Sequence, residues 1–183
     1  MSSAITSLTG LKNFSLLSIP AVWVLSISAH FYAVSLTKGR FTNASPRDYL
    51  ASISRKQNKS AIDHKYIRAE AAQQNGFENL GLYAAAIVAA HIAKLPAGHV
   101  NSLALGYVLS RLAYNVLYIF VTSEKLGELE VCKSGRRRRG MMMLTHRSRT
   151  ASLRSVSFLA GIGIIFKLFI SSAYALSENQ TWL

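Results

Sequence analysis

The stretch that decides the fold is Arg68–Tyr83, RAEAAQQNGFENLGLY, which is polar at its start and then turns apolar. It opens with an arginine, glutamates, glutamines and an asparagine, whereas most residues from Leu80 to Leu95 are apolar. A helix that enters a bilayer from a polar loop has this pattern, because the charged groups stay at the border and the apolar ones enter the lipid. We therefore predict a membrane span over about residues 68–95.

Three further stretches of the chain are apolar over the roughly 20 helical residues that a bilayer requires. They cover about residues 14–36, 100–121 and 153–176. The first is longer than the hydrophobic part of a signal peptide and little positive charge precedes it, so we interpret it as a retained span. With 183 residues, the chain is predicted to be one all-α membrane domain, residues 1–183.

Most of the positive charge of the chain lies in its loops. The formal net charge is +13, although half of the residues are hydrophobic, and this segregation favours a membrane protein over a nucleic-acid partner. The long segments between the first two spans and between the last two hold most of the lysines and arginines, which places both segments in the cytosol and both termini in the lumen. The single Cys132 and five scattered histidines predict no metal site.

The segment between the last two spans, about residues 123–150, carries the run KSGRRRRGMMM without apolar periodicity. This composition predicts a poorly ordered basic insert. Two origins stay open for it, a basic loop particular to this lineage and an intron retained in the gene sequence.

Polar side chains recur where the last three spans reach the cytosolic side. They are Arg68, Gln73, Asn75 and Glu78 in the second span, Arg111, Tyr114 and Tyr118 in the third, and Arg154 in the fourth. A charged group inside a span is costly, so we expect Glu78 and Arg111 to face the bundle interior. One interpretation is a Glu78–Arg111 pair that joins helices, with Asn75 beside it. The other is a site for a small anionic ligand with peptide-like groups, because cations outnumber acids here.

Two of these patterns resemble signatures of a known family. Arg68, Ala72, Asn75 and Glu78 before an apolar span, and Arg111, Tyr114 and Tyr118 in the next, are similar to motifs of the MAPEG family, the membrane-associated proteins of eicosanoid and glutathione metabolism. The run LRSVSFLAGIGIIFKLFISSA, residues 153–173, is similar to its fourth helix. The sequence of the second span looks closest to that of a bacterial and fungal branch of the family.

The resemblance implies a four-helix bundle assembled as a homotrimer in the endoplasmic reticulum membrane, with glutathione as co-substrate between neighbouring subunits. It implies a transferase or peroxidase that acts on lipophilic electrophiles or hydroperoxides arriving from the bilayer. The catalytic residue would be Arg154, which would hold the glutathione thiolate. The residues implied to bind glutathione are Arg68, Gln73, Asn75, Glu78, Arg111, Tyr114 and Tyr118.

The chain departs from the family pattern at several positions near the implied site. Ala71 stands where glutathione-binding members often have an arginine, Phe158 where some have a tyrosine, and Ile67 where an acid is common. The basic insert also lengthens the connection to the fourth span. Two alternatives therefore stay open: a non-catalytic protein that binds lipid or a partner, and a biosynthetic tailoring enzyme or isomerase that reuses the interhelical pocket.

Overall fold

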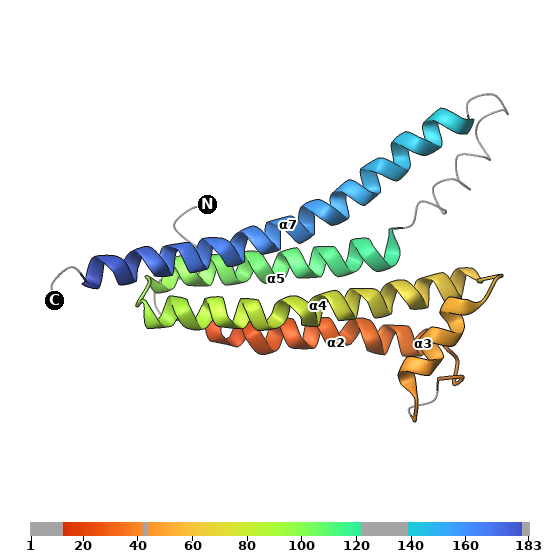
Figure 1. Cartoon of the computed structure of the whole chain (residues 1–183), viewed down its shortest axis with the longest axis horizontal. Coiled ribbons are helices and arrows are strands. Elements are labelled where there is room, and N and C mark those ends of the chain that lie inside the picture. Colours follow the sequence, from red (N-terminus) through yellow and green to blue (C-terminus); the bar gives the residue numbers. More distant parts are fainter. Residues whose placement is uncertain (1–12, 42–43, 122–138, 181–183) are drawn as a thin grey trace.

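The structure is a computed structural model that describes residues 13–41, 44–121 and 139–180. These ranges form helices and connecting turns, and they contain no strand. The elements are η1 (Ser15–Leu17), α2 (Ser18–Leu36), α3 (Pro46–Arg55), α4 (Ala61–Ile92), α5 (Ala97–Phe120) and α7 (Arg139–Gln180). The long helices α2, α4, α5 and α7 run up and down along one axis, and the short α3 lies across that axis at one end (Figure 1).

Three helical stretches of the described chain are long and apolar enough to cross a membrane. They are Ser15–Leu36, Ala97–Phe120 and Leu153–Glu178, in agreement with the predicted spans at about 14–36, 100–121 and 153–176. The predicted span at 68–95 falls on α4, whose 32 residues supply ample length. Polar residues in the first half of α4 lower its mean hydropathy, so α4 is not one of these three stretches. That α4 crosses the bilayer therefore stays a prediction.

The last part of the basic insert, which is predicted to be poorly ordered, lies in a helix. Helix α7 begins at Arg139, and its 42 residues therefore include the end of the 123–150 segment as well as the predicted fourth span. Arginine, methionine and leucine have high helix propensity, so the sequence RGMMML can extend a helix although it lacks apolar periodicity. The beginning of the insert lies outside the described residues.

Helices α4 and α5 are the centre of the packing, because each contacts the other and both contact α2 and α7. The tightest aromatic contact of the core joins α4 to α5: the rings of Tyr83 and Tyr107 stack with centroids 3.8 Å apart and planes 10° apart. Both side chains are fully buried. This stack fixes the register of α4 against α5, and hence the height at which the polar residues of the two helices face one another.

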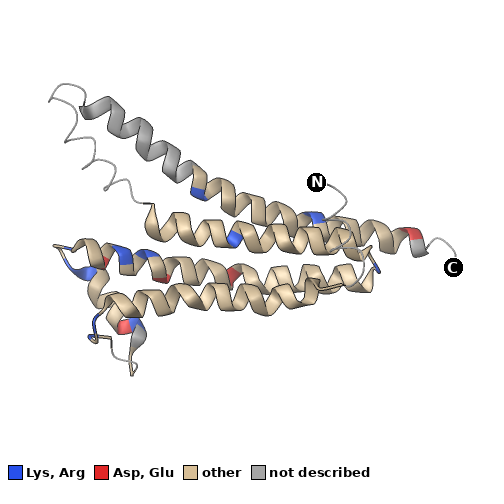
Figure 2. Cartoon of the chain, turned by 180° about the vertical axis from the view of Figure 1, so that it is seen from behind, with Lys and Arg blue, Asp and Glu red and all other residues tan. Residues whose placement is uncertain are grey.

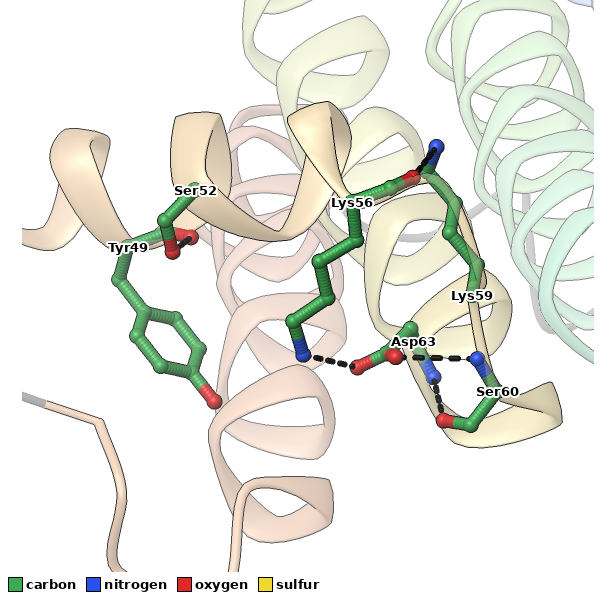
Figure 3. A network of polar contacts seen from close by, with 6 residues as sticks. All are labelled: Tyr49, Ser52, Lys56, Lys59, Ser60 and Asp63. Atoms are coloured by element: carbon green, nitrogen blue, oxygen red, sulfur yellow. Dashed lines mark hydrogen bonds and ion pairs between the residues drawn. The ribbon is translucent and has the colours of Figure 1, made fainter.

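The start of α4 is set by a capping box. The Ser60 hydroxyl accepts a hydrogen bond from the Asp63 backbone N–H at 3.1 Å, and the Asp63 carboxylate accepts one from the Ser60 N–H at 3.0 Å. Lys56 adds an ion pair to Asp63 at 3.4 Å. Figure 3 shows these contacts beside the end of α3. Such a cap satisfies backbone donors that the first turn of a helix leaves free.

At the opposite end of the bundle, η1 is tied to α4 and α5 by polar contacts. The Phe14 backbone N–H donates to Asn101 Oδ1 at 3.0 Å, and Ser15 Oγ lies 2.9 Å from His91 Nε2. The Ser18 hydroxyl is 2.6 Å from the Tyr83 hydroxyl. These bonds satisfy polar groups beside the core and hold α2 at a fixed height along α4 and α5.

Candidate functional site

The site is organised by one face of α5. Tyr107, Arg111, Tyr114 and Tyr118 are spaced by four, three and four residues, so at 3.6 residues per turn they follow one stripe. Arg111 is only 2 % exposed. Its guanidinium carbon lies 5.1 Å from the ring centre of Tyr107, 5.7 Å from that of Tyr114 and 5.1 Å from that of Phe158 on α7. The cation is thus surrounded by aromatic rings.

Helix α7 completes the enclosure of Arg111 through its backbone. Arg111 Nη2 donates to the Phe158 carbonyl at 3.2 Å, and Gly161 leaves the space that the guanidinium fills. Within the described chain, Arg111 Nε, Arg111 Nη1 and the Tyr107 hydroxyl have no hydrogen-bond partner. A buried guanidinium is costly, and the three aromatic faces and the carbonyl offset part of that cost.

Asn75 on α4 joins this stripe by a hydrogen bond. Its Nδ2 donates to the Tyr114 hydroxyl at 2.9 Å. The Tyr114 ring lies 5.3 Å from the Tyr118 ring, and the guanidinium carbon of Arg154 lies 5.3 Å from the Tyr118 ring centre. Residues from α4, α5 and α7 therefore meet at one level of the bundle, as the sequence predicted for Asn75, Arg111, Tyr114, Tyr118 and Arg154.

The predicted Glu78–Arg111 pair does not form, and Glu78 does not face the bundle interior of this chain. Glu78 is exposed and accepts a hydrogen bond from Gln74 Nε2 at 3.2 Å. It shares an exposed stripe of α4 with Gln74, Leu82 and Ala85, whereas Ala72, Gly76 and Tyr83 on the other side are buried. Glu78 is exposed because it lies on the side of α4 opposite to the side that packs in the bundle.

The two remaining residues of the predicted site lie on α4 near the same level. Gln73 and Arg68 are both partly exposed. Gln73 neighbours the exposed stripe in sequence, and Arg68 lies nearly two turns before Asn75. The structure thus divides the predicted residues into an enclosed group around Arg111 and an outward group on α4.

The enclosed group carries positive charge that no ion pair recorded in the described chain balances. Ion pairs recorded in the described chain join His30 to Glu70 at 2.9 Å and Lys56 to Asp63, and neither includes Arg111 or Arg154. Two guanidiniums therefore lie beside amide and hydroxyl groups without a carboxylate of the described chain against them. Arg154 is the partly exposed one of the two, and a guanidinium in that position suits an anionic molecule with hydrogen-bonding groups.

One member of the site was missed at the sequence level. Tyr107 faces the Arg111 cation and stacks on Tyr83, and it lies one helical turn before Arg111. Its spacing of four residues from Arg111 was the available signal, since residues at that separation share a helix face. His30 pairs with Glu70 and joins α2 to α4.

The fold and this site together define a helical membrane protein with a cationic, tyrosine-lined level inside its bundle. The model of the MAPEG family matches residues 10–126, which include α2, α3, α4 and α5, and the chain belongs to the MAPEG family. Arg154 and the rest of α7 lie outside the matched residues. No curated protein and no solved structure matches the chain.

The described residues contain no group of three histidine, cysteine, aspartate or glutamate side chains that could hold a metal ion. The absence of a metal stays a prediction, because Cys132 lies outside these residues.

Proposed function

We propose that the chain is a membrane-bound, glutathione-dependent transferase or peroxidase that acts on lipophilic electrophiles or hydroperoxides. The observation that carries the proposal is the meeting of Asn75, Tyr114, Tyr118 and Arg154 from three helices at one level, with no described carboxylate paired to Arg154. Glutathione is an anionic peptide, so it offers carboxylates to cations and amides to the Asn75 and tyrosine groups.

In this proposal residues of α4 bind the peptide and Arg154 acts on its sulfur. Gln73, Asn75 and Glu78 hold the peptide, with Glu78 accepting from the γ-glutamyl amine. Arg154 lowers the pKa of the thiol, and each unit of lowering corresponds to about 1.4 kcal/mol of preferential thiolate stabilisation. A guanidinium suits this role because it stays charged when partly desolvated.

The chemistry then needs only the thiolate and a substrate from the bilayer. In the transferase reaction the sulfur attacks an electrophilic carbon, a C–S bond forms and the leaving group departs with its electron pair. In the peroxidase reaction two glutathione molecules reduce a hydroperoxide to an alcohol and water, and they are oxidised to the disulfide. The exposed apolar side chains of α5 and α7, such as Leu112 and Leu159, offer a lipid-facing approach.

The proposal includes assembly as a homotrimer in the endoplasmic reticulum membrane, with both termini luminal. Glu78 lies on a stripe of α4 that this chain leaves exposed, so a neighbouring subunit would be needed to enclose the peptide. Native mass spectrometry of the detergent-solubilised protein tests this assembly, and a monomer without higher species would contradict it.

A second function, binding of a lipid or a partner without catalysis, is favoured by the enclosure of Arg111. With 2 % exposure and a bond to the Phe158 carbonyl, this guanidinium holds α5 to α7 and is not open to a ligand from outside the chain. Ala71 and Phe158 also lack the donor groups common in glutathione-binding members. A lost charge-assisted bond weakens binding by about 1.5–3 kcal/mol.

The deciding experiment is isothermal titration of the purified full chain with glutathione, followed by conjugation of chlorodinitrobenzene. We expect binding at millimolar glutathione or below and turnover that Arg154→Ala abolishes. Arg154→Lys is the matched variant, because it keeps a cation but not the planar guanidinium. Absence of binding at millimolar glutathione would favour the non-catalytic function. Full turnover in Arg154→Ala would refute the role given to this arginine.

A further inference from the structure

The second notable surface of the chain is a group of basic residues at the end of the bundle where α3 lies. The chain leaves α2 at Leu36, passes through α3 and returns into α4 at Ala61. Figure 2 shows lysines and arginines at this end and few along the middle of the long helices. We call this group the basic rim, and its members are Lys38, Arg40, Arg47, Arg55, Lys56 and Lys59.

Helix α3 is held in place by its apolar side. Ile53 is 3 % exposed and belongs to the core cluster at this end of the bundle. The Tyr49 ring meets the Tyr66 ring of α4 edge to face, with centroids 5.4 Å apart, and the Phe41 ring at 5.8 Å. Because these contacts occupy one side of α3, its other side carries Arg47 and Arg55 outward at fixed positions.

The charge of the basic rim is largely uncompensated. Five of the six cations are exposed and Lys59 is partly exposed, and the acids in the same stretch, residues 37–63, are Asp48 and Asp63. Asp63 is already engaged by the Ser60 N–H and by Lys56. The rim therefore keeps a clear excess of positive charge directed away from the bundle.

The rim lies next to lipid-facing surface. Phe31 of α2 is 67 % exposed, as suits a side chain against lipid tails. Helix α2 ends at Leu36, five residues or about 7.5 Å further along its axis, and Lys38 and Arg40 follow directly after it. These two cations therefore lie just past the lipid-facing surface of α2, and α3 extends the basic surface sideways because it runs across the bundle axis (Figure 1). The apolar side of α3 packs against Phe41 and Tyr66, so its basic side is left to face outward.

We propose that the basic rim binds anionic phospholipid head groups of the leaflet it faces. Phosphate and carboxylate groups of these lipids match the exposed lysines and arginines, and a basic residue close to the surface adds measurably to the attraction. The proximity of the rim to lipid-facing α2 makes a lipid a closer partner than a soluble polyanion. The binding is independent of glutathione chemistry.

The test is native mass spectrometry of the detergent-solubilised full chain, titrated with phosphatidylserine or phosphatidylcholine of equal chain length. We expect phosphatidylserine to bind more tightly, with a preference that declines as salt rises. Arg47→Gln combined with Arg55→Gln should weaken phosphatidylserine binding by about fivefold for each charge removed and leave phosphatidylcholine binding unchanged. Arg47→Lys combined with Arg55→Lys keeps the charge and should retain most of the preference.

Lys94→Gln is the matched control, because Lys94 is an exposed cation at the opposite end of the bundle. It should leave the preference intact. Equal binding of the two lipids by the unaltered chain would overturn the proposal. So would a preference that the glutamine pair leaves unchanged, since cations outside the rim would then be responsible for it.

Discussion

The guanidinium carbon of Arg154 on α7 lies 5.3 Å from the centre of the Tyr118 ring on α5. The contact is of the cation–π kind, which contributes about 0.5–2 kcal/mol depending on desolvation. Tyr118 in turn lies against Tyr114, whose hydroxyl accepts the bond from Asn75. A chain of contacts from α4 through α5 therefore determines where Arg154 is held.

Replacing Tyr118 separates the role of its ring from that of its hydroxyl. Tyr118→Leu removes the ring, so Arg154 is less well positioned and the pKa of bound glutathione thiol should rise. The rise should be below about 1.5 units, given about 1.4 kcal/mol per unit. Tyr118→Phe keeps the ring and loses the hydroxyl, so it should raise KM for glutathione and leave the thiol pKa unchanged. Ultraviolet absorbance of the thiolate against pH measures the pKa. Equal pKa values in the two variants would contradict a positioning role for the ring.

Gly161 on α7 is required by the position of Arg111. A Cβ at Gly161 would collide with Arg111 Nη2 and would approach Ser110 Oγ to 3.0 Å and Arg111 Cζ to 3.1 Å. The guanidinium cannot move away freely, because it is bonded to the Phe158 carbonyl and surrounded by rings. Gly161→Ala should therefore lower the free energy of unfolding by about 1–3 kcal/mol, as overpacking does.

Gly163→Ala is the matched control for this substitution. The position lies on the same helix, and a Cβ there meets no atom within 4 Å. Alanine favours helix over glycine by about 1 kcal/mol, so Gly163→Ala should be neutral or stabilising. Thermal unfolding in detergent compares the two variants, and equal melting temperatures would show that Arg111 adapts without cost.

The helices and the enclosed site were the features most accessible from the sequence. Long apolar runs predict α2, α5 and the membrane part of α7, because burial in lipid needs only length and hydropathy. The stripe of Arg111, Tyr114 and Tyr118 follows from helix geometry, since residues three and four apart share a face. Their meeting with Asn75 and Arg154 was anticipated because all lie at one end of their spans.

The direction in which α4 faces could not be read from its sequence. Polar and small residues occur on all sides of this helix, so no apolar stripe marks its packed side. The prediction therefore placed Glu78 toward the interior, whereas the structure shows it exposed. Tertiary contacts decide the rotation, chiefly the Tyr83–Tyr107 stack and the close approach of α2 at Gly76. Both depend on pairs of residues far apart in the chain, and a single sequence does not reveal which residues pair.

The close approach of α2 to α4 yields a prediction with an internal control. A Cβ at Gly76 would collide with Ser26 Oγ, would lie 2.8 Å from Ser26 Cβ and would touch the Ser26 backbone at 3.4 Å. Rotating the Ser26 hydroxyl does not clear its Cβ, so Gly76→Ala must move the two helices apart. We expect a loss of about 1–3 kcal/mol in the free energy of unfolding.

Second substitutions at Ser26 identify the colliding atom. Ser26→Gly removes the Cβ and should restore much of the melting temperature of Gly76→Ala, whereas Ser26→Ala keeps the Cβ and should not. Gly81→Ala, where a Cβ meets nothing within 4 Å, controls for the substitution itself. Rescue by Ser26→Ala as complete as that by Ser26→Gly would assign the collision to the hydroxyl instead.

The cap of α4 should make the stability of the fold depend on pH in the acid range, through a carboxylate at one helix end. The hydrogen bond from the Ser60 backbone N–H lowers the pKa of Asp63 below its usual value of 3.8, with smaller contributions from the Ser60 hydroxyl and Lys56. A lowered pKa in the folded state means that the carboxylate stabilises the fold above about pH 4. That contribution is lost as the pH falls through the pKa of the folded state.

Asp63→Asn should therefore lower the melting temperature at neutral pH, and its difference from the unaltered chain should shrink as the pH falls below about 4.

Ser60→Ala removes the acceptor for the Asp63 backbone N–H and should lower the free energy of unfolding by about 1 kcal/mol at neutral pH, the usual value of an N-cap. Ser54→Ala, at an exposed position of α3, is the matched control and should be near neutral. Hydrogen exchange at neutral pH should locate the Ser60→Ala effect in the first turn of α4, because that turn loses its cap while the Tyr83–Tyr107 stack holds the rest of the helix. Protection of that turn equal to the unaltered chain in Ser60→Ala would show that Lys56 and the packing of α3 hold it without the cap.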